Sequence, residues 1–230
     1  LARSNTRTIV QNRDDFADIT RMVPSAALNL RLVRGSGVDG NRFKFSPTPT
    51  GTPLIVLPGR MLRDKGVVEF AEAARLLKAQ GVAARFALVG PLDPDNRAAI
   101  SQDDIAAWVR DGIVEYWGSQ TDMPAVFTSA SVVCLPSYRE GLPRVLLEAA
   151  ASGRAIVTTD VPGCREIVQH DVNGLLVPAR NAHALAAALH RLIADPVLCA
   201  RLAAAGRAMV EAEFTLPRII AETLAVYAET

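Results

Sequence analysis

Residues 132–148 read VVCLPSYREGLPRVLLE and combine a short apolar run, a polar loop and a second apolar stretch that begins after a proline. The run 132–135 is rich in branched residues and predicts a buried strand. Pro143 suits the first turn of a helix, because its missing N–H would have no partner there. This order places Glu140 in the loop and Glu148 inside the helix, at the edge of a parallel sheet where open α/β folds bind ligands.

Similar apolar runs recur through most of the chain and alternate with stretches of helical spacing. The predicted strands cover residues 54–57, 85–89, 113–117, 132–135, 155–158 and 175–177. Gly81 is a left-handed terminator for one helix, and Asn181 caps another. Ser101, with Asp104 three residues on, forms a capping box. The alternation predicts an α/β fold: a Rossmann-like, mostly parallel sheet with helices on both faces.

The first fifty residues follow a different pattern. They contain one strand and one helix in RTIVQNRDDFADITRM, a second strand in LNLRLVRGSGV, and the proline-rich stretch SPTPTGTP. We expect residues 1–45 to be the remnant of a preceding domain with its linker, and residues 46–230 to form one α/β domain. Because residue 1 is leucine, we expect the sequence to be a piece of a longer protein.

The composition limits the classes of function. Half of the 230 residues are hydrophobic, enough to bury a full core, and the net charge of +1 gives no reason to expect nucleic acid as a partner. The three cysteines are widely spaced in apolar contexts, so we expect reduced core thiols and not a disulfide frame or a metal site. No apolar run approaches the length of a membrane span, and we expect a cytoplasmic protein.

The loop and helix start at 141–143 have the properties of an anion site. Free backbone N–H groups of Gly141, Leu142 and the first helical turn point outward with the positive end of the helix dipole. The dipole alone contributes about 0.3 to 1 kcal/mol, so a diphosphate would need cations as well. Arg60 and Lys65 follow strand 54–57 at the same edge, where their charge-assisted hydrogen bonds would contribute roughly 1.5 to 3 kcal/mol each.

Two glutamates beside a phosphate cradle indicate hydroxyls on the same ligand. Carboxylates do not bind phosphate, but they accept hydrogen bonds from hydroxyl groups. Glu140 and Glu148 therefore suggest a ligand that carries a ribose or a sugar next to its phosphates. A structural alternative stays open for each residue: Glu148 could pair with Arg144 one turn earlier, and Glu140 could be a loop acid that favours the helix dipole.

Further motifs extend this pattern along the chain. They are GRMLRDKG at 59–66, ALVG at 87–90, IVEYWG at 113–118, NGLLVPARN at 173–181 and the whole stretch 132–168. Together with the spacing E-x7-E at 140–148, they resemble the retaining glycosyltransferases of family 4, which have the GT-B fold. The resemblance covers residues 35–230 and implies the C-terminal, donor-binding domain of such an enzyme, with residues 1–45 as the end of its acceptor-binding domain.

The resemblance implies a role for each matching residue. Arg60 and Lys65 correspond to the basic pair that grips the donor diphosphate, and Glu140 to the acid that contacts the transferred sugar; we assign these three to catalysis. The residues assigned to donor binding are Gly59, Gly90, Trp117, Gln120, Gly141, Leu142, Pro143 and Glu148. Glu148 would accept from the ribose hydroxyls, and the turn 117–120 would pack on the base. The resemblance implies no metal or other cofactor, because the cations and the helix end neutralise the leaving diphosphate.

Several other side chains have structural interpretations beside the functional ones. We expect Trp108 and Trp117 to pack in the fold more than to stack on a ligand. Gly163 and Glu166, in PGCREI, match a further motif of the family, and Glu166 could orient its own loop. The segment VGPLDPDNRAAIS departs from the longer glycine loop of many members, so the resemblance leaves the donor contacts of Gly90 open.

The implied function is transfer of a hexosyl or N-acetylhexosaminyl group, with retention of configuration, from a UDP-sugar to a glycan or lipid-linked acceptor. Residues 136–153 and 159–168 are similar to bacterial members that extend lipid-linked oligosaccharides, which implies a polyprenyl diphosphate acceptor at the cytoplasmic face of the inner membrane. None of His170, His183 and His190 matches the histidine that the family places in the acceptor domain. Because the resemblance implies that this acceptor-binding lobe is missing from the sequence, we expect the chain to bind donor without turnover. Two alternatives remain open: a GT-B-fold sugar-nucleotide 2-epimerase and a non-catalytic nucleotide-sugar-binding module.

Overall fold

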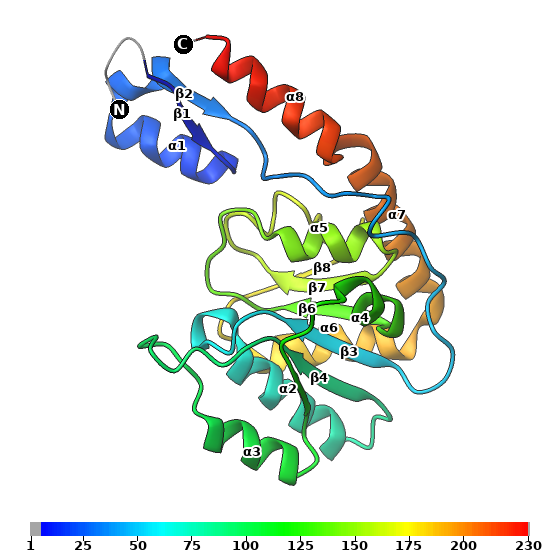
Figure 1. Ribbon diagram of the computed structural model, residues 1–230. Coiled ribbons are helices and arrows are strands. Elements are labelled where there is room, and N and C mark those ends of the chain that lie inside the picture. Colours follow the sequence, from blue (N-terminus) through cyan, green and yellow to red (C-terminus); the bar gives the residue numbers. More distant parts are fainter. Residues whose placement is uncertain (1–5, 230) are drawn as a thin grey trace.

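The computed structural model describes residues 6–229, in which parallel strands form a six-stranded and a two-stranded sheet (Figure 1). The strands of the larger sheet are β3 (Leu54–Pro58), β4 (Arg85–Val89), β5 (Glu115–Gly118), β6 (Val132–Leu135), β7 (Ala155–Thr159) and β8 (Leu175–Val177). Their order is β5-β4-β3-β6-β7-β8, and every neighbouring pair is parallel. The carboxyl ends of all six strands therefore lie at one edge.

Helices cover both faces of the larger sheet. They are α2 (Val67–Ala79), α3 (Gln102–Arg110), α4 (Met123–Ser129), α5 (Arg144–Ala151), α6 (Ala182–Ala194) and α7 (Pro196–Glu213). Helices α2, α3 and α6 pack on one face, α4 and α5 on the other, and α7 contributes to both layers. The predicted Rossmann-like α/β fold is confirmed.

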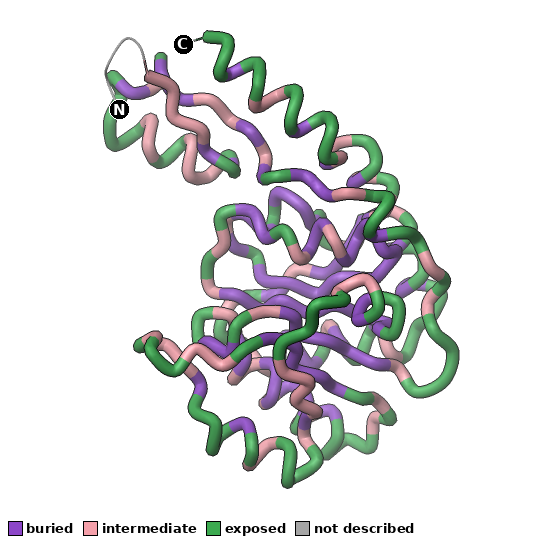
Figure 2. The backbone as a smooth tube through the Cα atoms, viewed as in Figure 1, coloured by how far each residue is buried: buried purple, intermediate pink, exposed green. Residues whose placement is uncertain are grey.

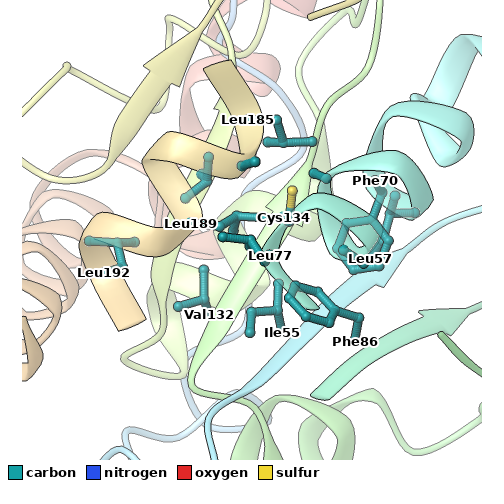
Figure 3. Packing of buried hydrophobic residues seen from close by; sticks show 14 of the residues in the cluster. Ile55, Leu57, Phe70, Leu77, Phe86, Val132, Cys134, Leu185, Leu189 and Leu192 are labelled. Carbon is teal, nitrogen blue, oxygen red and sulfur yellow. The ribbon is translucent and has the colours of Figure 1, made fainter. Parts of the chain in front are cut away.

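Strands β3, β6 and β7 are buried on both sides, which explains their continuous runs of mostly apolar residues, whereas the edge strand β5 is only half-buried (Figure 2). On one face, Leu57 and Phe86 of the sheet pack with Phe70 and Leu77 of α2, and the thiol of Cys134 lies in the same layer (Figure 3). All three cysteines are free and buried, as predicted. Burial raises the pKa of the Cys164 thiol to about 12, so it stays protonated at neutral pH.

The predicted boundaries hold where a strand is a short, isolated apolar run. Strands β4, β6 and β8 have the predicted limits, but β5 begins two residues later than expected. The amides of Ile113 and Val114 donate to the carbonyl of Trp108, so these two residues close the turn after α3. The side chains of Ser101 and Asn181 cap α3 and α6 as predicted. Pro143 is the N-cap of α5 and not its first residue.

The smaller sheet comes from the first part of the chain. β1 (Thr8–Val10) pairs in parallel with β2 (Leu30–Leu32), and the chain between them forms α1 (Arg13–Met22) and the 3-10 helix η1 (Pro24–Asn29). The predicted domain 1–45 includes these elements, and its first five residues lie outside the described part of the chain.

The last helix, α8 (Leu216–Tyr227), was not predicted and runs back beside this smaller unit (Figure 1). Its residues Ile219 and Val226 pack with Val33, which follows β2. The prediction placed these residues in the domain 46–230, whereas their buried contacts are with the smaller unit. Within residues 6–229, no helix combines the length and the apolarity that crossing a bilayer requires.

Candidate functional site

A cavity of about 500 Å³ opens at the carboxyl edge of the six-stranded sheet. It lies where β3 and β6 are neighbours and the chain turns to opposite sides of the sheet, the position at which open α/β folds bind ligands. The residues that line it are Pro58, Gly59, Arg60, Lys65, Val89, Gly90, Pro91, Ser119, Gln120, Met123, Leu135, Glu140, Leu142, Pro143, Arg144, Val145 and Glu148. Loops after four strands and the start of α5 therefore meet in one hollow.

All but two of the predicted site residues line this cavity. Those that do are Gly59, Arg60, Lys65, Gly90, Gln120, Glu140, Leu142, Pro143 and Glu148. Trp117 instead packs on the buried core, and its indole Nε1 donates to Glu115 at 2.9 Å, in agreement with the packing interpretation. Gly141 faces α1, where the side chain of Asn12 donates to its carbonyl oxygen at 2.8 Å.

Two glycines shape the floor of the cavity between β3 and β4. Gly90 has a φ of 148°, and a Cβ atom on it would collide with the carbonyl oxygen of Gly59. The amide of Gly59 donates to Val89, and that of Gly90 donates to Gly118, each at 2.8 Å. The absence of a side chain at residue 90 lets these two strand ends approach closely.

Lys65 and Glu140 form an ion pair at the centre of the site. Lys65 ends the 3-10 helix η2 (Arg63–Lys65) after β3, and its Nζ lies 2.6 Å from Oε1 of Glu140. The hydroxyl of Ser137 donates to the same oxygen at 2.7 Å, and Thr159 donates to the Ser137 carbonyl. Both donors use Oε1, so Oε2 is the oxygen of Glu140 that can accept a hydrogen bond from a ligand.

Arg60 lies at the rim of the cavity and is more exposed. Its side chain is 55% exposed, and one guanidinium nitrogen lies 2.8 Å from a carboxylate oxygen of Asp93. An exposed pair of this kind contributes about 0 to 1 kcal/mol and exchanges readily. Arg60 can therefore leave Asp93 for an anion in the cavity at little cost.

Glu148 is a largely desolvated carboxylate in the second turn of α5. Its side chain is 13% exposed and pairs with Arg144 at 2.9 Å, one turn earlier, as the structural alternative for this residue predicted. Burial raises the pKa of Glu148, and the positive charges of Arg144 and Arg42 partly oppose that shift. The pairing does not remove Glu148 from the cavity, because the residue also lines it.

Sequence reasoning missed three residues that shape this region. Ser137 supports Glu140, and Met123 adds an apolar wall from α4, whose start is marked by the N-cap Asp122 followed by a proline in the first turn. That capping signal could have revealed α4. Asn12 reaches the loop from 129 positions away, and its only local signal is its place before the acidic first turn of α1.

The histidines lie away from the residues that line the cavity. His170 sits in a turn, where its Nδ1 accepts a hydrogen bond from the Leu176 amide at 3.0 Å. His183 and His190 lie on α6, which packs on α2. In residues 6–229, histidine, cysteine and acidic side chains do not gather in any group of three or more that could hold a metal ion.

Comparison with known proteins identifies the family to which the chain belongs. The family model described as "Glycosyl transferases group 1" matches residues 52–195. A curated relative from Campylobacter jejuni, N,N'-diacetylbacillosaminyl-diphospho-undecaprenol alpha-1,3-N-acetylgalactosaminyltransferase, is 36% identical over 151 residues, which cover 66% of this chain and 38% of that protein. The chain spans only 38% to 41% of the length of the first curated relatives that it matches.

Solved structures agree on the fold. HepE from Anabaena, in complex with UDP, has a TM-score of 0.80 at 22% identity, over 96% of this chain and 64% of that chain. The C-terminal domain of the group 1 glycosyl transferase LpcC from Francisella tularensis has a TM-score of 0.68 at 25% identity, over 78% of this chain and 100% of that domain. With the family model covering more than half of its length, the chain belongs to the glycosyl transferases group 1 and has the α/β architecture of the GT-B glycosyltransferases.

Proposed function

We propose that this chain is the donor-binding part of a retaining glycosyltransferase, which transfers a sugar from a UDP-sugar to a glycan or lipid-linked acceptor. The observation that carries the proposal is the convergence of Arg60, Lys65, Glu140 and Glu148 on one cavity at the start of α5. Two cations, a helix N-terminus and two carboxylates match the groups of a nucleoside diphosphate sugar, which are two phosphates and two sets of hydroxyls.

Each part of the donor has a natural partner in the cavity. Arg60 and Lys65, with the N–H groups at the loop 141–143, would bind the diphosphate. Oε2 of Glu140 would accept from a hydroxyl of the transferred sugar, and Glu148 from the ribose. The base would lie against Ser119 and Gln120, and not against Trp117, which packs in the core.

The chemistry that we propose needs no metal. The bond between the anomeric carbon and the diphosphate oxygen breaks while the acceptor oxygen attacks from the same face of the sugar. The acceptor proton passes to the leaving diphosphate, whose negative charge is stabilised by Arg60, Lys65 and the helix end. In this scheme Lys65 also holds Glu140 in place, because its Nζ contacts Oε1 at 2.6 Å.

The relatives support an acceptor that is a glycan or a lipid-linked sugar. The Campylobacter jejuni relative is named for a diphospho-undecaprenol acceptor, and other relatives are named for amylovoran and colanic acid biosynthesis. We propose that the acceptor binds on a preceding domain, so that this chain binds donor without turnover. A polyprenyl-linked acceptor would bring the protein to the cytoplasmic face of the inner membrane. The 2-epimerase and the non-catalytic module are not favoured, because the matched family is one of transferases.

Calorimetric titration with UDP, GDP and ADP tests the proposal. We expect UDP to bind below millimolar concentration, and both Arg60→Ala and Glu148→Gln to weaken it by about tenfold or more, since each removes a hydrogen bond to a charged group. Arg110→Ala, on the exposed side of α3, and Glu222→Gln, on α8, are matched controls and should bind as the wild type does. A folded wild-type chain that binds none of the three nucleotides would refute the proposal.

A further inference from the structure

Asn12 joins the smaller unit to the loop that carries Glu140. Its side chain is 0% exposed and lies at the start of α1. The oxygen Oδ1 accepts from the Asp15 amide at 2.7 Å and caps the helix. The nitrogen Nδ2 donates to the Asp15 carboxylate at 2.7 Å and to the Gly141 carbonyl at 2.8 Å. One buried amide therefore serves a helix in one unit and a backbone carbonyl in the other.

The contact with Gly141 determines the direction of a peptide N–H group. The peptide between Gly141 and Leu142 is trans and planar, so its N–H points away from its C=O. The carbonyl points to Asn12, and the Leu142 amide must then point away from α1. Because Leu142 lines the cavity and Gly141 does not, the amide is directed to the cavity side of the loop.

Gly163 supports the same orientation from a second loop. It has a φ of 81°, and a Cβ atom on it would come within 2.5 Å of the Gly141 carbonyl oxygen and 2.6 Å of the Glu140 carbonyl oxygen. Both carbonyls of the loop are thus packed against backbone on the side away from the ligand. The consecutive N–H groups of Gly141 and Leu142 face the opposite way, in the manner of an anion-binding nest.

The start of α1 is fixed on this side of the loop by several charges. The buried carboxylate of Glu166 accepts from the Arg13 amide at 2.7 Å, which holds the first residue of the helix. Asp15 pairs with Arg139 at 2.5 Å, and Asp14 pairs with Arg165 at 3.3 Å. These contacts keep Asn12 within reach of Gly141 independently of its own hydrogen bond.

We infer that Asn12 is a positioning residue of the donor site: by binding the Gly141 carbonyl it directs the Leu142 N–H at the donor diphosphate. The inference rests on the proposed function, since the diphosphate is the anion to be bound. It makes the smaller unit a participant in donor binding, although none of the residues from position 6 onward in that unit lines the cavity.

Two substitutions separate this role from helix capping. Serine and aspartate cap helices about as well as asparagine, so Asn12→Ser and Asn12→Asp keep the cap of α1. Asn12→Ser is too short to reach Gly141, and Asn12→Asp is isosteric but has no N–H to donate. Asn181→Ser is the matched control, because Asn181 caps α6 through the Ala184 amide in the same way.

Calorimetry with UDP and the amide NMR signal of Leu142 are the two measurements. We expect the Kd for UDP to rise about tenfold in Asn12→Ser, because one backbone hydrogen bond to a charged ligand is misdirected. In Asn12→Asp it should rise further, because a carboxylate then faces a carbonyl. In the wild type, UDP should shift the Leu142 amide strongly, and Asn12→Ser should reduce that shift while Asn181→Ser changes neither quantity.

Several results would overturn the inference. If both Asn12 variants bind UDP as tightly as the wild type, the residue only caps α1. If either variant fails to fold, the wild type still decides: a Leu142 amide that does not respond to bound UDP refutes the role. If the wild type binds no UDP, the proposed function fails separately, and the ligand-free Leu142 signal, shifted in Asn12→Ser and not in Asn181→Ser, still tests the orientation.

Discussion

The two edges of the six-stranded sheet both carry arginine, and they use it in opposite ways. At the amino edge, Arg154 precedes β7 and is 1% exposed. Its guanidinium donates to four backbone carbonyls, which belong to Ala130, Ser152, Ser46 and Pro47. At the carboxyl edge, Arg60 is half exposed and its partner, Asp93, belongs to a surface loop.

The two edges differ in whether their cationic side chains already have all their hydrogen-bond partners within the protein. Every nitrogen of the Arg154 guanidinium has a carbonyl partner, so this arginine has no donor nitrogen without a partner to offer a ligand. The ion pairs of Arg60 and Lys65 are partly solvated and can be exchanged for those of a bound anion. A saturated, buried cation indicates architecture, and an unsaturated cluster of charges at the switch point of the sheet indicates a site.

The largest effect that this comparison predicts is at Arg154. Arg154→Ala leaves several buried carbonyls without a donor and should lower the free energy of unfolding by about 3 to 5 kcal/mol. Urea denaturation followed by circular dichroism measures it. The folded fraction should bind UDP within about twofold of wild type, because the site is at the opposite edge.

Arg110→Ala is the control for Arg154→Ala. Arg110 lies on α3 with its side chain 74% exposed, and its loss should change stability by less than about 0.5 kcal/mol. An Arg154→Ala variant that unfolds at the wild-type urea concentration would contradict the assignment of the amino edge to architecture.

At the carboxyl edge we expect the opposite balance: a substitution should weaken UDP binding strongly and change the free energy of unfolding only slightly. Lys65→Met removes a charge-assisted hydrogen bond to the diphosphate and should raise the Kd for UDP by about 10- to 100-fold. The loss of its pair with Glu140 should cost about 1 kcal/mol of stability or less, since Ser137 still supports the carboxylate. Calorimetry and urea denaturation on the same sample separate the two.

Lys78→Met serves as the control on the same stretch of chain. Lys78 is exposed near the end of α2, and its substitution should leave UDP binding unchanged. If Lys65→Met destabilised the fold as much as Arg154→Ala does and left UDP binding intact, Lys65 would be a structural residue, and the assignment of the ligand site to the carboxyl edge would be contradicted.

The sequence predicts those contacts whose partners each follow a recognisable element, and it misses contacts between segments far apart in the chain that carry no local pattern. Lys65 and Glu140 could be placed together, because each follows a recognisable parallel strand and such strands end at a common edge. Arg154 could not, since arginine is usually exposed and its burial depends on the segment 46–47, more than a hundred residues away. The contact of Asn12 with Gly141 and the packing of α8 on the smaller unit are missed for the same reason: local patterns carry no signal of such pairings.

Glu148 sharpens the comparison, because it is largely desolvated and also part of the candidate site. Burial raises its pKa above the usual value of 4.5, so the folded state holds its proton to a higher pH than the unfolded chain does. Stability should therefore fall as the pH rises from 4.5 through the raised pKa. UDP binding should follow the opposite course, since the carboxylate is the form that would accept hydrogen bonds from two ribose hydroxyls under the proposed function.

The pH dependence of UDP binding tests whether the ionised form of Glu148 is the one that binds the ligand. Between about pH 8 and pH 5, the wild-type affinity should fall by a few-fold, with a midpoint above that of an exposed glutamate. Glu148→Gln should bind more weakly throughout and should lack this decline. Parallel profiles for the two proteins would show that another group controls the pH dependence.

The smallest effect concerns Arg144, and it distinguishes a surface ion pair from a functional one. Arg144 is 58% exposed and pairs with Glu148 four residues on, so Arg144→Ala should cost only about 0.3 to 0.5 kcal/mol of stability. Arg218 pairs with Glu222 on α8 with the same spacing, and Arg218→Ala should cost a similar amount. Stability alone therefore cannot tell the two pairs apart.

The pH dependence of UDP binding can distinguish the two ion pairs, because Arg144 and Glu148 line the cavity and Arg218 and Glu222 do not. Arg144 lowers the pKa of Glu148, so its removal should raise that pKa further and move the decline in UDP affinity to higher pH. Arg218→Ala should leave the profile where it is. If Arg144→Ala also leaves it unchanged, Glu148 does not titrate in contact with the ligand, and the simple helix pair describes this residue better than a ribose acceptor does.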